Sequence, residues 1–171
     1  IFAYIPFYLQ QFLSENGKIG LILSNAWLGT DYGEELLELF QEFFKIDFVV
    51  ISGKGKWFDN ADVVTTILVA SKKAPKIATP EASEISFCTL KEELESIADM
   101  KTLSDNIFIN TESENLTINR YSLAQIKTLE DFGIPWSGYF ANLSWVDSVK
   151  DSFINTSEIF HFTRGERRGW N

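Results

Sequence analysis

The sequence predicts an α/β domain, and the order of two kinds of segment along its first half is the main reason. Short apolar runs at residues 18–23, 46–51 and 63–70 have the length of buried strands, and amphipathic stretches at residues 2–13 and 31–44 have helical spacing. Helix, strand, helix, strand, strand is an α/β unit that ends in a hairpin-like pair. With 171 residues, of which 45% are hydrophobic, the chain is long enough to bury a core.

The first helix and strand follow from spacing and from their end signals. Pro6 lies early enough to fit a first helical turn, and Asn16-Gly17 is a typical helix stop. Residues 18–23 are apolar on both faces, which indicates a strand buried between helix layers. The helical stripe consists of Phe2, Ile5, Leu9, Phe12 and Leu13.

Asp31 is expected to cap the second helix, because Glu34 follows three residues later as in a capping box. Its glutamates face solvent, and its apolar stripe consists of Leu36, Leu37, Phe40, Phe43 and Phe44. The two later strands, rich in β-branched residues, are separated by a flexible Gly-Lys-Gly-Lys loop at residues 53–56.

From about Lys72 onward the pattern is more polar and predicts a peripheral insertion, with a strand at residues 85–89 and a helix at residues 91–100. Ser122 and Gln125 form a second capping box, and that helix ends at Gly133 and Pro135. The remainder predicts an aromatic-rich connector at residues 136–140, a short helix at residues 143–150 and a strand at residues 158–162.

Charge and composition limit the classes of function. The net charge of -9 argues against a free-standing nucleic-acid binder, whose affinity depends on cations that neutralise phosphates. The single Cys88 and single His161 argue against a disulfide scaffold and a multi-histidine metal site. No apolar run is long enough to span a bilayer, and no signal peptide is evident, so a cytoplasmic protein is expected.

Three segments, in one order, resemble N6-adenine-specific DNA methyltransferases of restriction-modification systems. Residues 16–28 (NGKIGLILSNAWL) resemble the strand that follows the catalytic motif in that family. Residues 57–69 (WFDNADVVTTILV) are similar to its pattern of an aromatic, an alanine, a valine and a strand, and residues 160–171 (FHFTRGERRGWN) resemble the entry to its target-recognition region.

The resemblance implies a partial Rossmann-like methyltransferase sheet, its second half, followed by a mixed α+β extension. Residues 1–75 would be the C-terminal half of the catalytic domain, residues 76–140 an insertion or connector, and residues 141–171 the start of the target-recognition region. The family binds S-adenosylmethionine on a glycine-containing turn and adenine on an Asn-Pro-Pro-Tyr or related tetrapeptide. This sequence contains neither motif, so the chain alone is expected to be an inactive fragment.

Phe58 is the candidate base-stacking residue, since by resemblance it occupies the position that stacks on a flipped adenine. Spacing alone favours a core role for Phe58, and Trp57 is the alternative stacking residue if the alignment shifts by one. Asn25 lies where a strand leaves the sheet, so it either lines the pocket or caps a local turn.

Two groups of cations are candidates for contacts with double-stranded DNA. Lys54 and Lys56 either meet phosphate, helped by the adjacent glycines, or belong to a solvated turn. Arginines clamp anions through two hydrogen bonds, which favours a DNA role at the chain's end, with surface solubility as the alternative. These arginines are Arg164, Arg167 and Arg168.

Three functions remain open at this point. The leading hypothesis is one part of an adenine-N6 DNA methyltransferase, with a fused or partner nuclease. A non-catalytic DNA-binding or subunit-contact module with a degenerate methyltransferase fold is favoured by the net acidity. A Rossmann-like enzyme acting on RNA or protein would leave the terminal arginines without a role. An unpaired central strand would also expose an edge at which copies of the chain could pair.

Overall fold

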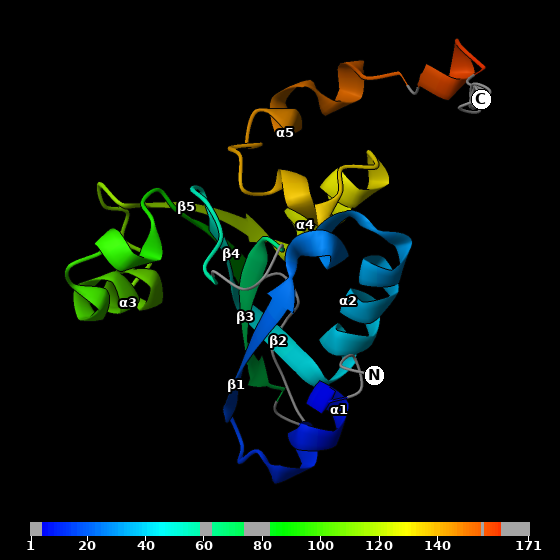
Figure 1. Ribbon diagram of the computed structural model, residues 1–171. Coiled ribbons are helices and arrows are strands. Elements are labelled where there is room, and N and C mark those ends of the chain that lie inside the picture. Colours follow the sequence, from blue (N-terminus) through cyan, green and yellow to red (C-terminus); the bar gives the residue numbers. More distant parts are fainter. Residues whose placement is uncertain (1–4, 59–62, 74–82, 155, 162–171) are drawn as a thin grey trace, which may run out of the picture.

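A computed structural model describes residues 5–58, 63–73, 83–154 and 156–161 (Figure 1). The strands are β1 (Lys18–Ser24), β2 (Phe44–Ser52), β3 (Thr65–Lys72), β4 (Glu84–Leu90) and β5 (Leu116–Ser122). The α-helices are α1 (Ile5–Leu9), α2 (Asp31–Phe43), α3 (Met100–Phe108), α4 (Leu123–Asp131) and α5 (Val146–Val149). Short 3-10 turns include Gln10–Phe12, Asn25–Gly29, Leu94–Ser96, Trp136–Gly138, Lys150–Ser152 and Thr156–Glu158.

The five strands form one mixed sheet in the order β1-β3-β2-β4-β5. Strand β3 runs antiparallel to both β1 and β2, β2 runs parallel to β4, and β5 runs antiparallel to β4. The hairpin-like pair predicted from residues 46–51 and 63–70 is confirmed, because β2 and β3 pair antiparallel. So is the α/β class, a partial Rossmann-like sheet with a mixed extension.

The region expected to be a peripheral insertion supplies two strands of the same sheet. The strand predicted at residues 85–89 is confirmed as β4, whereas β5 was not predicted. Only Leu116 and Tyr121 of β5 are buried, and Thr117, Asn119, Arg120 and Ser122 are polar, so its sequence gives a weak strand signal. The domain limits at residues 75 and 140 stay a prediction.

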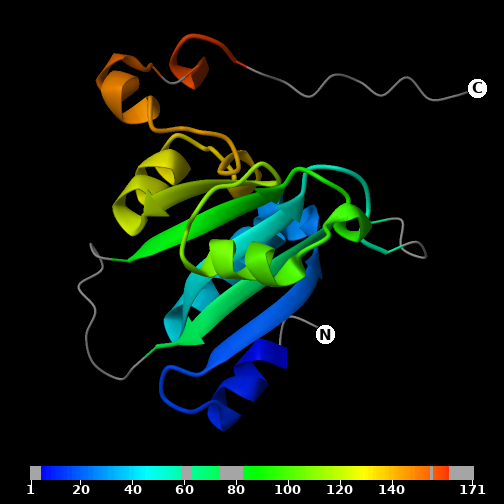
Figure 2. The ribbon, with the colours of Figure 1, turned by 90° about the vertical axis from the view of Figure 1, so that its left-hand side faces the viewer.

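Helices cover both faces of the sheet: α2 and α4 lie on one face and α3 lies on the other (Figures 1 and 2). Each face has its own apolar core, the larger beneath α2 and α4 and the smaller beneath α3. Phe48 faces the smaller core and packs edge-on against Phe108 at a centroid distance of 5.4 Å.

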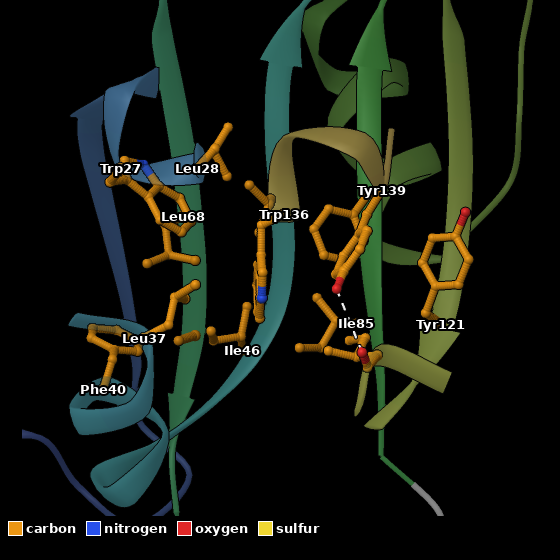
Figure 3. Close-up of a cluster of buried hydrophobic side chains, with 14 of the residues drawn as sticks. Trp27, Leu28, Leu37, Phe40, Ile46, Leu68, Ile85, Tyr121, Trp136 and Tyr139 are labelled. Atoms are coloured by element: carbon orange, nitrogen blue, oxygen red, sulfur yellow. Dashed lines mark hydrogen bonds between the residues drawn. The ribbon is translucent and has the colours of Figure 1, made fainter. Parts of the chain in front are cut away.

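The aromatic connector expected at residues 136–140 is part of the larger core (Figure 3). Trp136 and Tyr139 are buried there, and each ring contacts Phe87 of β4, at 5.4 and 5.3 Å respectively. Trp27, from the turn after β1, lies in the same core, where its indole N–H donates to Thr66 Oγ1 at 2.9 Å. Residues far apart in sequence therefore share one aromatic cluster.

Helix ends test the capping predictions directly. The capping box at Ser122 and Gln125 is confirmed, and Gly133 has the positive φ of 71° expected where α4 ends. The cap of α2 is Thr30 rather than Asp31, because the Thr30 hydroxyl accepts from the Gly33 N–H at 3.3 Å.

The helix predicted at residues 91–100 is wrong. Only the 3-10 turn Leu94–Ser96 lies in that range, and α3 starts at Met100. Asp99 caps α3, since its carboxylate accepts from the Thr102 N–H at 2.9 Å and from the Thr102 hydroxyl at 2.6 Å. A capping aspartate favours non-helical backbone at its own position, so the helix starts after it.

Beyond α4, α5 and the 3-10 turns that follow it lie on the far side of α4 from the sheet, with Val146 still buried in the larger core (Figure 2). The short helix predicted at residues 143–150 is confirmed in part as α5. The strand predicted at residues 158–162 is wrong for the described residues, because the Ile159 and Phe160 N–H groups both donate to the Thr156 carbonyl and form a turn. His161 is exposed, and residue 162 lies outside the described residues.

Cys88 provides a test of the sheet. It is fully enclosed in β4, and burial raises the pKa of its thiol from 9.0 to about 12. Because the thiolate is the reactive form, we expect iodoacetamide at pH 8 to leave the folded chain unlabelled and to label the chain in denaturant. Mass spectrometry before and after urea addition measures this, and rapid labelling of the native chain would contradict the placement of β4.

Among the described residues, no helix is long and apolar enough to cross a membrane.

Candidate functional site

Several segments that the sequence predicts to be functional lie at one end of the sheet, called the carboxyl edge because β1, β2 and β4 terminate there. The register pairs Ser24 with Thr65 and Ser52 with Leu90, so β1, β2 and β4 all end there and β3 begins there. Loops at the carboxyl ends of parallel strands are where open α/β sheets bind ligands. The loop after β2 carries Phe58 to this edge.

The start of this loop is fixed by backbone contacts. The Gly53 N–H donates to the Leu90 carbonyl at 2.7 Å, which ties the loop to the end of β4. A Cβ at Gly53 would lie 2.8 Å from that carbonyl oxygen, so a larger residue would separate the two segments. The Ser52 hydroxyl contacts the Lys54 backbone, and Gly55 turns the chain with a φ of 68°.

The two aromatic residues that follow have different environments. Trp57 packs against the smaller core, and its indole N–H is enclosed with no hydrogen-bond acceptor in the described part of the chain. Phe58 is 46% exposed. A ring that stacks on an incoming base must be accessible, so this geometry favours Phe58 over Trp57 for that role. The stacking role of Phe58 stays a prediction.

The loop lysines lie in a mixed electrostatic setting. Lys54 forms an ion pair with Glu92, with Nζ 3.0 Å from the carboxylate, and both side chains are largely exposed. Such a pair adds little stability, so phosphate can compete for the lysine. Lys56 is exposed on the same loop. Local sequence does not indicate Glu92 as a partner of Lys54, because the strand pairing that brings residues 54 and 92 together is not local.

The other candidate residues fall into two groups. Asn25 is exposed, and its backbone N–H donates to the Val64 carbonyl at 2.9 Å, which continues the pairing of β1 with β3 by one residue; its pocket and capping roles both stay predictions. Arg164, Arg167 and Arg168 lie outside the described residues. Among the described side chains, no group of three His, Cys, Asp or Glu residues could hold a metal ion.

The described residues do not fit a site for S-adenosylmethionine. Such a site needs a glycine-containing turn between a strand and the N-terminus of a helix. Strand β1 runs instead into the 3-10 turn Asn25–Gly29, and the glycine loop after β2 leads to β3 rather than to a helix. No step of a methyl transfer is therefore assigned to a cofactor held by this chain.

Comparison with known proteins gives a similarity of fold. No protein-family model and no curated protein sequence matches the chain. The type IIG restriction endonuclease BpuSI is similar in structure over 88% of this chain, with a TM-score of 0.56 and 11% sequence identity. The chain shares the fold of one segment of a restriction-modification enzyme. It spans 17% of the BpuSI chain.

Two further structures share less of the geometry. One is assigned as the modification subunit of a type I restriction enzyme from Vibrio vulnificus, with 12% identity over 72% of this chain and a TM-score of 0.46. The other is a chain of a type I restriction-modification system, with 16% identity over 85% of this chain and a TM-score of 0.44. This chain spans 29% and 34% of their lengths.

Proposed function

We propose that this chain is part of a restriction-modification DNA methyltransferase that transfers a methyl group from S-adenosylmethionine to N6 of adenine. The observation that carries the proposal is the half-exposed Phe58, on a loop anchored at the carboxyl edge of a sheet whose fold is similar to a segment of BpuSI. The motif order of residues 16–28, 57–69 and 160–171 supports it.

In this proposal the chain binds and orients the DNA rather than reacting with it. Phe58 offers its face to an adenine that has left the helix stack, which holds the base without a covalent bond. Lys54, Lys56 and the terminal arginines, Arg164, Arg167 and Arg168, contact phosphates and set the position of the duplex. Correct placement of the adenine amino group accounts for much of the rate in such a transfer. The cofactor site and the tetrapeptide that binds adenine belong, in this proposal, to other parts of the protein.

Methylation of DNA by the protein that contains this chain tests the proposal. We expect labelled S-adenosylmethionine to transfer its methyl group to duplex DNA, and nucleoside digestion with mass spectrometry to find N6-methyladenine. The matched control is the 171-residue chain alone, which is expected to transfer none and to bind the cofactor no better than an unrelated protein. Methylation on cytosine would contradict the adenine assignment.

A second function is favoured by one observation, the net charge of -9. It is a non-catalytic DNA-binding or subunit-contact module that keeps a degenerate methyltransferase fold. DNA binding without any methyl transfer, at saturating cofactor, would support this module and contradict the enzyme.

A nuclease, fused to the proposed methyltransferase or present as its partner, is also part of the proposed restriction-modification system.

A further inference from the structure

Gly53, the first residue after β2, approaches the end of β4 so closely that no room is left for a side chain. A Cβ at Gly53 would lie 2.8 Å from the Leu90 carbonyl oxygen and 3.0 Å from the methyl carbon of Thr89. Ordinary contacts of a Cβ begin at about 3.4 Å, so a side chain would push the loop and β4 apart by roughly half an ångström. The φ of Gly53 is not positive, unlike that of Gly55, so the glycine is required by close approach and not by backbone conformation.

The residues on either side of Gly53 meet the same segment of the chain. Ser52 pairs with Leu90 in the parallel register of β2 and β4, and the Lys54 Nζ lies 3.0 Å from the Glu92 carboxylate. The ion pair is largely exposed and adds little stability. The backbone contact at Gly53 is therefore the main attachment between the start of the loop and the end of β4.

The other end of the loop is attached to β4 through side chains. Trp57 packs against the smaller core, and Leu90 is a buried member of that core. Leu90 thus contributes to both attachments, through its carbonyl at Gly53 and through its side chain in the core beneath Trp57. Phe58 follows directly, with 46% of its surface exposed. A displacement of the loop at Gly53 would therefore change the position of the Phe58 ring relative to β4.

We propose that Gly53 is a positioning residue for the Phe58 ring at the carboxyl edge. This inference rests on the proposed function, because it takes Phe58 to be the ring on which a flipped base stacks. Gly53 touches neither the base nor the cofactor and acts only by letting the loop lie against β4. A misplacement of about 1 Å can lower a rate on the order of a hundredfold, so a shift of roughly half that size should cost less.

Gly53→Ala in the protein that contains this chain tests the proposal. We expect the proposed adenine methylation to be about tenfold slower, with the affinity for S-adenosylmethionine unchanged. The matched control is Gly20→Ala in β1, where a Cβ would meet nothing within 4 Å, and its methylation rate should stay the same. Gly53 is exposed and belongs to neither core, so thermal melting should find both variants folded.

A double-mutant cycle with Phe58→Ala separates positioning from a general structural role. If Gly53 acts through Phe58, Gly53→Ala should slow methylation by at most about twofold more once the Phe58 ring is removed. Losses that multiply in the double variant would show that Gly53 acts through something else and would overturn the proposal. So would a Gly53→Ala protein that methylates at the unaltered rate.

Hydrogen exchange in the 171-residue chain tests the loop attachment without any methyl transfer. We expect the backbone amides of residues 53–58 to exchange at least about tenfold faster in Gly53→Ala, because the bond to the Leu90 carbonyl is weakened. Unchanged exchange would overturn the role of Gly53 whatever the methylation rate. Faster exchange in a protein that methylates no DNA even when unaltered would support the loop attachment and contradict the proposed function instead.

Discussion

Replacing Phe87 with alanine is expected to destabilise the protein by about 3–5 kcal/mol, the usual cost of emptying a buried phenylalanine site. Phe87 is 0% exposed on the central part of β4, and its ring makes edge-on contacts with Tyr121, Trp136, Tyr139 and Phe140. Those rings come from β5 and from the connector after α4, so the resulting cavity would weaken the contact between them and the sheet. Urea denaturation, monitored by tryptophan fluorescence, measures the loss in free energy of unfolding.

The matched control is Phe132→Ala, because Phe132 is a largely exposed ring just after α4. We expect it to cost at most about 1 kcal/mol, since surface substitutions seldom cost more. Equal losses for the two variants would show that residues 116–140 do not pack on β4 as described.

Replacing Phe58 with alanine should slow the proposed adenine methylation by roughly tenfold to a hundredfold. Stacking on an aromatic side chain contributes on the order of 1–3 kcal/mol per base, and each 1.4 kcal/mol is a factor of ten. Fluorescence of 2-aminopurine at the target position should also fall toward the value of 2-aminopurine stacked inside the duplex, because less of the base stays flipped out. The affinity for S-adenosylmethionine should hardly change, because the lost contact is to the base alone.

Two further variants separate stacking from structure. Phe58→Tyr keeps a flat ring and should restore most of the activity, whereas Phe12→Ala removes an exposed ring near α1 and should have no effect. An equal loss of cofactor affinity in Phe58→Ala would indicate a structural role for Phe58 instead. Loss of activity in Trp57→Ala is less informative, since Trp57 packs against the smaller core.

The exposed position of Phe58 is determined by tertiary packing. Its neighbour Trp57 has the same apolar character in the sequence, and nothing in the local pattern shows which ring is buried. The structure separates them because Gly53 is tied to β4 and the smaller core accepts only Trp57. The choice between the two stacking candidates therefore depended on packing between distant segments.

The sequence by itself determined the elements whose signals are local. Apolar runs predicted β1, β2, β3 and β4, and the Ser122 capping box with Gly133 predicted both ends of α4. These predictions succeeded because burial of strands and hydrogen bonding at helix ends act over a few residues.

Only the tertiary structure decided which segments meet. Strand β5 is polar at most positions and becomes a strand by pairing with β4. No α-helix forms over residues 91–99, and α3 begins only after the Asp99 cap. The ion pair of Lys54 with Glu92 likewise joins residues far apart in the chain. Such contacts depend on sheet order and register, which backbone pairing across the whole sheet establishes and local sequence does not encode.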